Sequence, residues 1–158
     1  MKIRGFEFIS EEQQKKDFGR VISDLRLPER ATKGSAGYDF YAPFDIKLDA
    51  GESISVPTGI RSYMQKGEVL KVYPRSGLGF KHFARLANTV GIIDEDYYFS
   101  DNEGHIFIKL RNEKMKDSLF IKKGEAFAQG IFSLFLLSDS DDLSKGKIRN
   151  GGFGSSNK

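Results

Sequence analysis

Apolar and polar residues alternate in short runs along most of this chain, and glycine-containing turns separate the runs. Successive side chains of a β-strand point to opposite faces, so an alternation with a period of two predicts a strand with one buried face. The runs predicted as strands are residues 2–9, 38–42, 44–48, 53–56, 58–64, 69–73, 90–93, 105–110, 118–121 and 126–137. Ser10 and Gln13 form a capping-box pattern, which predicts a short polar surface helix from Ser10 to about Lys16. Many short strands with almost no helix predict an all-β sandwich or barrel.

The last run, residues 126–137, is rich in Phe and Leu. Its phenylalanines Phe127, Phe132 and Phe135 are predicted to lie in the core, and Gly130 suggests a bulge. Gln129 is an amide within this apolar strand, so it needs hydrogen-bond partners if it is buried.

Composition narrows the class of protein. The chain has 158 residues, the length of one domain, and 39% of them are hydrophobic, which is enough for a sizeable core. It contains no cysteine and no apolar run near the about 20 residues of a membrane span, so we expect a cytoplasmic protein without membrane association. The net charge is +3, which suits a polyanionic ligand. The basic residues are spread along the chain, so no direct nucleic-acid binding is expected.

The stretch Asn88-Thr-Val-Gly-Ile-Ile-Asp-Glu-Asp-Tyr97 concentrates candidate chemistry. It begins as an apolar strand, in which Gly91 suggests a bulge or a close approach to the backbone. The carboxylates Asp94, Glu95 and Asp96 follow at once. Such a cluster can hold a metal or activate water, and it can equally be an ordinary acidic turn.

Pro74-Arg75-Ser76-Gly77-Leu78-Gly79 ends the predicted strand 69–73. Arg75 offers a fixed charge and Ser76 a hydroxyl, while Gly77 and Gly79 let main-chain N–H groups face a phosphate. A plain turn or a helix start has the same composition.

The C-terminal part is polar. Residues 138–146 are rich in Ser and Asp and are predicted to be a flexible connector, so we divide the chain into a β-domain, 1–137, and an arm, 138–158. The end of the arm, Arg149-Asn-Gly-Gly-Phe-Gly-Ser-Ser156, is typical of a disordered terminus. It also has the composition of a lid, in which a ring stacks on a base and Gly and Ser groups wrap phosphate.

Five segments resemble, in the same order, the five motifs of the trimeric dUTPases. They are Ala36-Gly-Tyr-Asp39, Pro74-Arg-Ser-Gly-Leu78, Asn88 to Tyr97, Gly124-Glu-Ala-Phe-Ala-Gln129 and Arg149 to Asn157. Some positions depart from the family pattern. Glu125 and Ala126 replace the common Asp and Arg of the fourth motif, and the loop 98–104 is longer than usual. In the fifth motif, Arg149 lies one residue closer to the Phe than is most common, and Ser156-Asn157 replaces Thr-Gly.

The resemblance implies an antiparallel jelly-roll β-barrel and a homotrimer with three sites at subunit interfaces, each covered by a C-terminal arm. It implies Mg²⁺-dependent hydrolysis of dUTP to dUMP and pyrophosphate. That reaction prevents uracil incorporation into DNA and supplies dUMP for thymidylate synthesis.

The resemblance also implies residue roles. Asp94 matches the catalytic carboxylate, which orients and deprotonates the water that attacks the α-phosphorus. The uracil edge is assigned to Asn88 and to the main chain of residues 89–93, including Gly91 and Ile93, and the deoxyribose to Tyr97. The phosphates are assigned to Arg75, Ser76, Gly77 and Gln129. Asp39 is expected to support these residues without contacting the phosphates. The arm contributes Phe153, stacked on uracil, and Arg149, Gly154, Ser155 and Ser156 at the γ-phosphate. Mg²⁺ is expected on the phosphates and waters, without a direct protein ligand.

Two other functions remain open. The related dCTP deaminases carry a catalytic Glu in a Gly-His-x-Thr-Leu-Glu-Leu strand, whereas Gly104-His-Ile-Phe-Ile-Lys109-Leu has lysine at that position. A dUTPase-fold regulator that binds an unknown protein partner is the other, with the loop 98–104 and the polar N-terminal segment as its natural partner surfaces.

Overall fold

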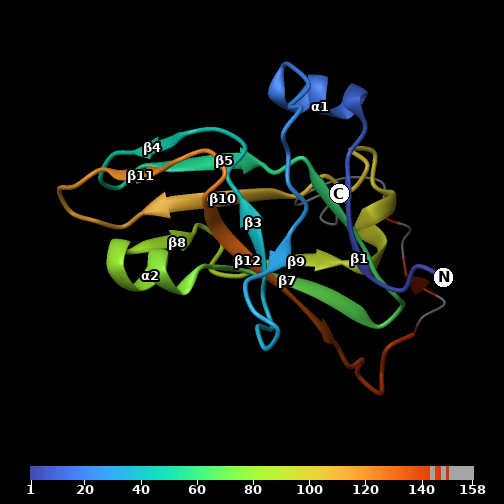
Figure 1. Ribbon diagram of the computed structural model, residues 1–158. Helices are drawn as coiled ribbons and strands as arrows, with labels where there is room; N and C mark the ends of the chain where they lie inside the picture. Colours follow the sequence, from blue (N-terminus) through green and yellow to red (C-terminus); the bar gives the residue numbers. More distant parts are fainter. Residues whose placement is uncertain (143–144, 147–148, 150–158) are drawn as a thin grey trace.

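The computed structural model describes residues 1–142, 145, 146 and 149 (Figure 1). The elements in chain order are β1 Gly5–Phe8, α1 Glu11–Phe18, β2 Glu29–Arg30, β3 Tyr38–Tyr41, β4 Ile46–Leu48, β5 Ser53–Pro57, β6 Ile60–Tyr63, β7 Glu68–Pro74, α2 Ser76–His82, β8 Ala84–Leu86, β9 Gly91–Asp94, the 3-10 helix η1 Glu95–Phe99, β10 Phe107–Asn112, β11 Leu119–Ile121 and β12 Ala126–Leu134. The predicted all-β class is confirmed. Residues 76–82 are a helix that the alternation pattern did not predict.

The strands of the described residues form four sheets and do not define one closed barrel. The largest sheet has the order β2-β3-β12-β7-β9, and a second has the order β5-β10-β8. β1 pairs with β6, and β11 pairs with β4. All these pairs are antiparallel, and β7 lies between β12 and β9. The sheet therefore brings together strands from the beginning, the middle and the end of the chain.

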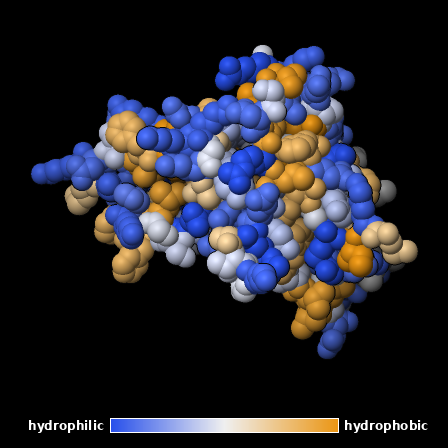
Figure 2. Space-filling view, viewed as in Figure 1, coloured by the Kyte–Doolittle hydropathy of each residue, from blue (hydrophilic) through white to orange (hydrophobic). Residues whose placement is uncertain are grey.

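The core is formed by the inward faces of these strands. Phe40, Leu70, Leu110 and Phe127 are all at most 1% exposed. The core position predicted for Phe127 is confirmed, but Phe135 is 39% exposed because β12 ends at Leu134. The next residues continue as exposed apolar chain, and Figure 2 shows hydrophobic surface at the lower edge of the molecule.

Gly130 does not mark a bulge. The irregularity in the β12–β3 pairing lies between Ala126 and Ala128. A Cβ on Gly130 would lie 2.9 Å from a Leu70 methyl and 3.0 Å from the Phe40 ring. The glycine is therefore needed for close packing across the sheet rather than for an irregular ladder.

Helix α1 follows the predicted cap. The Ser10 hydroxyl accepts a hydrogen bond from the Gln13 N–H at 3.1 Å, and Gly19 ends the helix with a φ of 73°. The expected surface position is only partly correct, since Gln13 and Gln14 are each 6% exposed. The side-chain oxygen of Gln14 accepts a hydrogen bond from the Ile22 N–H at 3.0 Å, which explains how an amide can be buried here.

No helix in the described part of the chain is long and apolar enough to cross a membrane.

Candidate functional site

Three of the predicted phosphate-site residues meet where β7 ends. Gln129 of β12 lies opposite Asp39 on one side and Tyr73 on the other. The Asp39 carboxylate is 3.1 Å from the Nε of Arg75, and the Gln129 amide donates to the Pro74 carbonyl at 3.2 Å. Asp39 is 8% exposed, whereas the Arg75 side chain is 41% exposed. The buried carboxylate thus holds a guanidinium that still faces solvent, as expected for an anion-binding arginine.

Gly37 makes this arrangement possible. A Cβ at Gly37 would lie 2.3 Å from the side-chain oxygen of Gln129. The glycine of the first motif therefore leaves the space that the glutamine of the fourth motif occupies.

The segment after Arg75 opens a helix rather than a loop. Arg75 has an extended backbone and is the N-cap of α2, Ser76–His82. A cavity of about 340 Å³ lies between α2 and the start of β12, lined by Arg75, Gly77, Leu78, Lys81, His82, Glu125 and Ala126. Lys81 was not among the predicted site residues, and it adds a second permanent cation to the cavity. Its position one helical turn after Gly77 was a usable signal once a helix was considered.

The stretch 88–97 begins with a tight turn. Thr89 has a φ of 66°, and the Asn88 carbonyl accepts a hydrogen bond from the Val90 N–H at 2.7 Å. The strand β9 then runs beside β7, and a Cβ on Gly91 would lie 3.1 Å from the Cβ of Val72. Of the two readings of Gly91, close approach of the backbone is therefore the correct one.

The three carboxylates that follow have different surroundings. Glu95 accepts a short hydrogen bond from the Gly67 N–H and so fixes a turn. The Asp94 side chain is 48% exposed and pairs with Nη2 of Arg149, whose Nε lies 2.8 Å from Asp96. Arg149, which was predicted at the γ-phosphate, lies between these two carboxylates in the single chain.

Tyr97 is buried, being 3% exposed, and its hydroxyl is hydrogen-bonded. It donates to the His105 carbonyl at 2.8 Å and accepts from the side-chain amide of Asn102 at 2.9 Å. Burial raises the pKa of the Tyr97 hydroxyl above its usual range, so the group remains a donor. The amide comes from the enlarged loop 98–104, which therefore helps to hold the tyrosine predicted to contact deoxyribose.

His105 connects this region with helix α1. It is fully buried, its Nε2 accepts a hydrogen bond from the Gly59 N–H at 2.8 Å, and its Nδ1 lies 2.5 Å from the Asp17 carboxylate. A backbone N–H can only donate, so Nε2 carries no proton and Nδ1–H donates to Asp17. Burial lowers the pKa of His105, while Asp17 opposes the shift. His105 and Asn102 are supporting residues that the sequence motifs did not indicate.

The residues around Arg75 and the acidic residues that begin at Asp94 lie at opposite ends of β7. Asp94 lies opposite Val69, near the start of the strand, whereas Arg75 follows its last residue. Val69 and Arg75 are six residues apart (75 − 69). At a rise of about 3.3 Å per residue, the distance along β7 between the position of Asp94 and that of Arg75 is about 20 Å. The backbone positions of Asp94 and Arg75 in one chain are therefore not brought together at the same end of β7.

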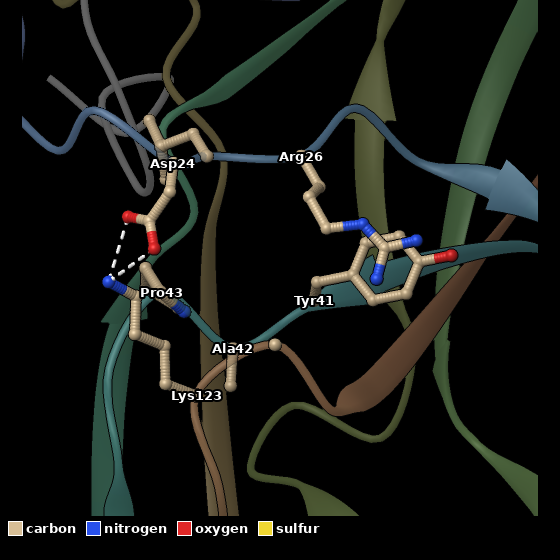
Figure 3. A pocket seen from close by; sticks show the side chains of 8 residues that line it. Asp24, Arg26, Tyr41, Ala42, Pro43 and Lys123 are labelled. Carbon is tan, nitrogen blue, oxygen red and sulfur yellow. Dashed lines mark hydrogen bonds and ion pairs between the residues drawn. The ribbon is translucent and has the colours of Figure 1, made fainter.

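Two other cavities bear on the predicted site. One of about 370 Å³ is lined by Ser55, Ala87, Asn88, Phe107 and Lys109, so it includes the residue predicted to bind uracil. The other, of about 450 Å³, contains no predicted site residue (Figure 3). Its charged groups are already satisfied, since Lys123 is 2.7 Å from Asp24 and the Arg26 guanidinium stacks 3.7 Å from the centre of the Tyr41 ring.

The remaining predicted site residues, Phe153, Gly154, Ser155 and Ser156, lie outside the described residues. Within the described part of the chain, no three His, Cys, Asp or Glu side chains are grouped to hold a metal ion.

Comparisons with known proteins identify relatives of this chain. The family described as dUTPase matches residues 23–157. The deoxyuridine 5'-triphosphate nucleotidohydrolase of Lactococcus lactis subsp. lactis (strain IL1403) is 42% identical over 156 residues, which cover 98% of this chain and 98% of that protein. The protein of the same name from Shigella sonnei (strain Ss046) is 38% identical over 148 residues, which cover 88% of this chain and 92% of that protein.

Solved structures show the same relationship. The crystal structure of dUTPase from Streptococcus mutans matches with a TM-score of 0.69 at 38% identity and covers 86% of this chain and 99% of that chain. The dUTPase from phage phi11 of S. aureus matches with a TM-score of 0.68 and covers 92% of this chain and 99% of that chain. Its identity is 19%, so it shows a shared fold.

Proposed function

Because this chain belongs to the dUTPase family, we propose that it hydrolyses dUTP to dUMP and pyrophosphate, with Asp94 as the base that activates the attacking water. The observation that carries this assignment is the position of Asp94. Its side chain is half-exposed at the end of β9, three residues before the buried Tyr97, so water can reach the carboxylate. The reaction limits uracil incorporation into DNA and supplies dUMP for thymidylate synthesis.

The phosphates bind at the residues near the end of β7. Arg75 supplies a charged fork, Ser76 and Gly77 supply polar groups at the start of α2, and Gln129 supplies an amide. Asp39 acts through Arg75, because its buried carboxylate limits the positions that the guanidinium can take.

The base and sugar bind along the stretch 88–97. Asn88 and the main chain of residues 89–93, including Gly91 and Ile93, contact the uracil edge. The hydrogen-bonded ring of Tyr97 packs against the deoxyribose and leaves no room for a 2′-hydroxyl.

We infer a homotrimer with shared sites from membership of the dUTPase family, and the separation of about 20 Å along β7 between Asp94 and Arg75 of one chain supports sites shared between copies. Complete sites form when the phosphate-binding end of one copy meets the acidic end of another. The apolar residues Leu134, Leu136 and Leu137 are 75%, 95% and 53% exposed, and such a run suits burial against a second copy.

The arm, residues 138–158, closes the site. Phe153 stacks on uracil, and Arg149, Gly154, Ser155 and Ser156 bind the terminal phosphate. Arg149 contacts Asp94 and Asp96 in the single chain, so we infer that it exchanges these carboxylates for phosphate oxygens when dUTP binds.

Mg²⁺ is the proposed cofactor. Among the described residues, Asp94 and Asp96 lie close enough to share the Arg149 guanidinium, but no group of three acidic or His ligands is formed, and this donor set fits an ion that keeps its waters and binds substrate phosphates. When bound, the ion neutralises charge on the triphosphate. The residues of the chain contribute in two ways. Arg75 holds the phosphates, and Asp94 holds the attacking water. A cytoplasmic location stays a prediction from the sequence.

The test is to incubate the protein with dUTP, dCTP, dTTP and UTP, each with Mg²⁺, and to resolve the products. We expect pyrophosphate from dUTP alone. Asp94→Asn should lower kcat by a factor on the order of 100 to 10,000, the usual contribution of a general base. Asp96→Asn is the matched control, because it makes the same change two residues away and removes the other partner of Arg149.

Other products would favour other functions. Ammonia from dCTP would replace this proposal with deamination. Binding of dUTP without turnover would favour a regulator. Its partner surface would be the loop 98–104, where Phe99 is 80% exposed and Arg61 lies 4.4 Å from the centre of the Tyr98 ring.

A further inference from the structure

Helix α1 is attached to the enlarged loop 98–104 near both of its ends. Ser10, the N-cap of the helix, donates to the Glu103 carboxylate from its backbone N–H at 2.8 Å and from its hydroxyl at 2.6 Å. Near the other end, the Asp17 carboxylate lies 2.5 Å from Nδ1 of His105, which follows the loop. Figure 1 shows α1 outside the sheets. These contacts therefore join the start of the chain to the segment between η1 and β10.

The loop has a conformation that needs such support. Glu103 has a φ of 60°, in the left-handed region that is unfavourable for a residue other than Gly. Gly104 follows with a φ of 72°, and a Cβ there would lie 2.7 Å from the Cα of Tyr98. Ser10 binds the side chain of Glu103 itself. The helix thus contacts the loop at a strained residue, where the surrounding structure must hold the backbone.

Asp17 fixes the buried imidazole of His105. Nε2 of His105 accepts a hydrogen bond from the Gly59 N–H at 2.8 Å, so the proton lies on Nδ1 and needs an acceptor. The Asp17 carboxylate is that acceptor, and the Gln13 amide donates to the same carboxylate oxygen at 2.8 Å. Without Asp17, either tautomer would leave a buried donor unpaired, because Nδ1–H would lose its acceptor or Nε2–H would face the Gly59 N–H.

The His105 carbonyl carries this constraint to the nucleoside site. It accepts the hydrogen bond of the Tyr97 hydroxyl at 2.8 Å. The Asn102 amide donates to the same hydroxyl at 2.9 Å, and the Asn102 carbonyl accepts from the backbone N–H of His105 at 3.1 Å. Asp17, His105 and Tyr97 thus form a continuous chain of contacts from α1 to the residue assigned to the deoxyribose.

We propose that Asp17 is a positioning residue for the nucleoside site: it holds His105 in one tautomer, and the His105 carbonyl in turn holds the Tyr97 ring against the sugar. This inference rests on the proposed function of the site. It gives a part in substrate selection to residues 1–22, which precede the part of the chain that matches the dUTPase family. A purely structural role of Asp17 would change stability alone, whereas a positioning role also changes the choice between deoxyribose and ribose.

The experiment compares Asp17→Ala and Asp17→Leu, which remove the acceptor, with Asp17→Asn, which keeps an oxygen that can accept from Nδ1–H. Glu12→Ala is the matched control, because it removes a carboxylate of the same helix whose side chain is 82% exposed and pairs with Lys16 at 3.2 Å. For each variant, kcat and KM are measured for dUTP and UTP with Mg²⁺, together with Tm. Titration calorimetry gives the Kd of the α,β-imido analogues of dUTP and UTP.

For Asp17→Ala and Asp17→Leu we expect the preference for the deoxyribose nucleotide to fall about 10-fold, because a remote substitution that displaces a contact residue by about 1 Å can cost up to about 100-fold. KM for dUTP should rise more than kcat falls, since the sugar contact acts in binding. Asp17→Asn and Glu12→Ala should retain the preference of the unaltered protein.

An unchanged preference in both Asp17→Ala and Asp17→Leu, whatever their Tm, would overturn the inference, because Asp17 would then contribute only to stability. An equal fall in Asp17→Asn or in Glu12→Ala would also overturn it. The imido analogues are bound without turnover. If the unaltered protein fails to hydrolyse dUTP, the proposed function fails, and the preference between the analogues still decides the role of Asp17.

Discussion

Removal of the Tyr97 hydroxyl tests whether the enlarged loop holds the nucleoside site. Tyr97→Phe keeps the buried ring and deletes a group that donates to the His105 carbonyl at 2.8 Å and accepts from Asn102 at 2.9 Å. The carbonyl retains a longer bond from the same amide, at 3.4 Å, so it does not lose every partner. One lost hydrogen bond and one poorly satisfied amide together cost about 1–3 kcal/mol.

The free energy of unfolding is measured by urea denaturation at a fixed protein concentration, and Tm by calorimetry. For a protein of this size, about 2 kcal/mol corresponds to a fall in Tm of about 4–8 °C. Tyr73→Phe is the matched control, because no hydrogen bond from its hydroxyl is formed within the described residues. The control should change stability by less than about 0.5 kcal/mol.

Two results would refute the reasoning. A loss below about 0.5 kcal/mol would show that the hydroxyl does not form a buried hydrogen bond. A Tyr97→Phe protein that is destabilised as expected but discriminates between dUTP and UTP as before would show that these hydrogen bonds do not position the ring for the sugar.

Three other predictions concern the support of the site and the core. Asp39→Asn should release Arg75 and raise KM for dUTP about 10-fold without loss of the fold, and an unchanged KM would separate Asp39 from phosphate binding. The pKa of His105 is lowered by burial below its usual 6.5, so the unfolded chain binds more protons there and the free energy of unfolding should fall as pH drops below 6.5. His105→Gln should flatten that dependence in denaturation measured between pH 7.5 and 5, and an equal slope would contradict it. Gly130→Ala places a Cβ 2.9 Å from a core methyl and should cost about 1–3 kcal/mol in urea denaturation, whereas Gly34→Ala, with nothing within 4 Å, is the control.

Local features of the chain were predictable because they depend on neighbouring residues. Alternation located most strands, and the cap at Ser10 located α1, since both patterns act over a few residues. The sequence left a helix start as only one alternative at α2, because Ser76-Gly-Leu-Gly-Phe-Lys-His82 contains two glycines and no helical periodicity. The exposure of Phe135 was missed because alternation predicts two faces of a strand and does not say where the sheet stops covering them.

The candidate site, like the fold, was predictable only in part. The family motifs can be identified in the chain without a structure, and they set the chemical types at Asp94, Arg75, Asn88 and Tyr97. Which of these residues come together depends on how the strands pair. Strand pairing depends on residues far apart in the chain, so it alone placed Asp94 about 20 Å along β7 from Arg75. The same pairing brought Lys109 to the cavity beside Asn88, because strands β8 and β10 become neighbours only when the sheet forms.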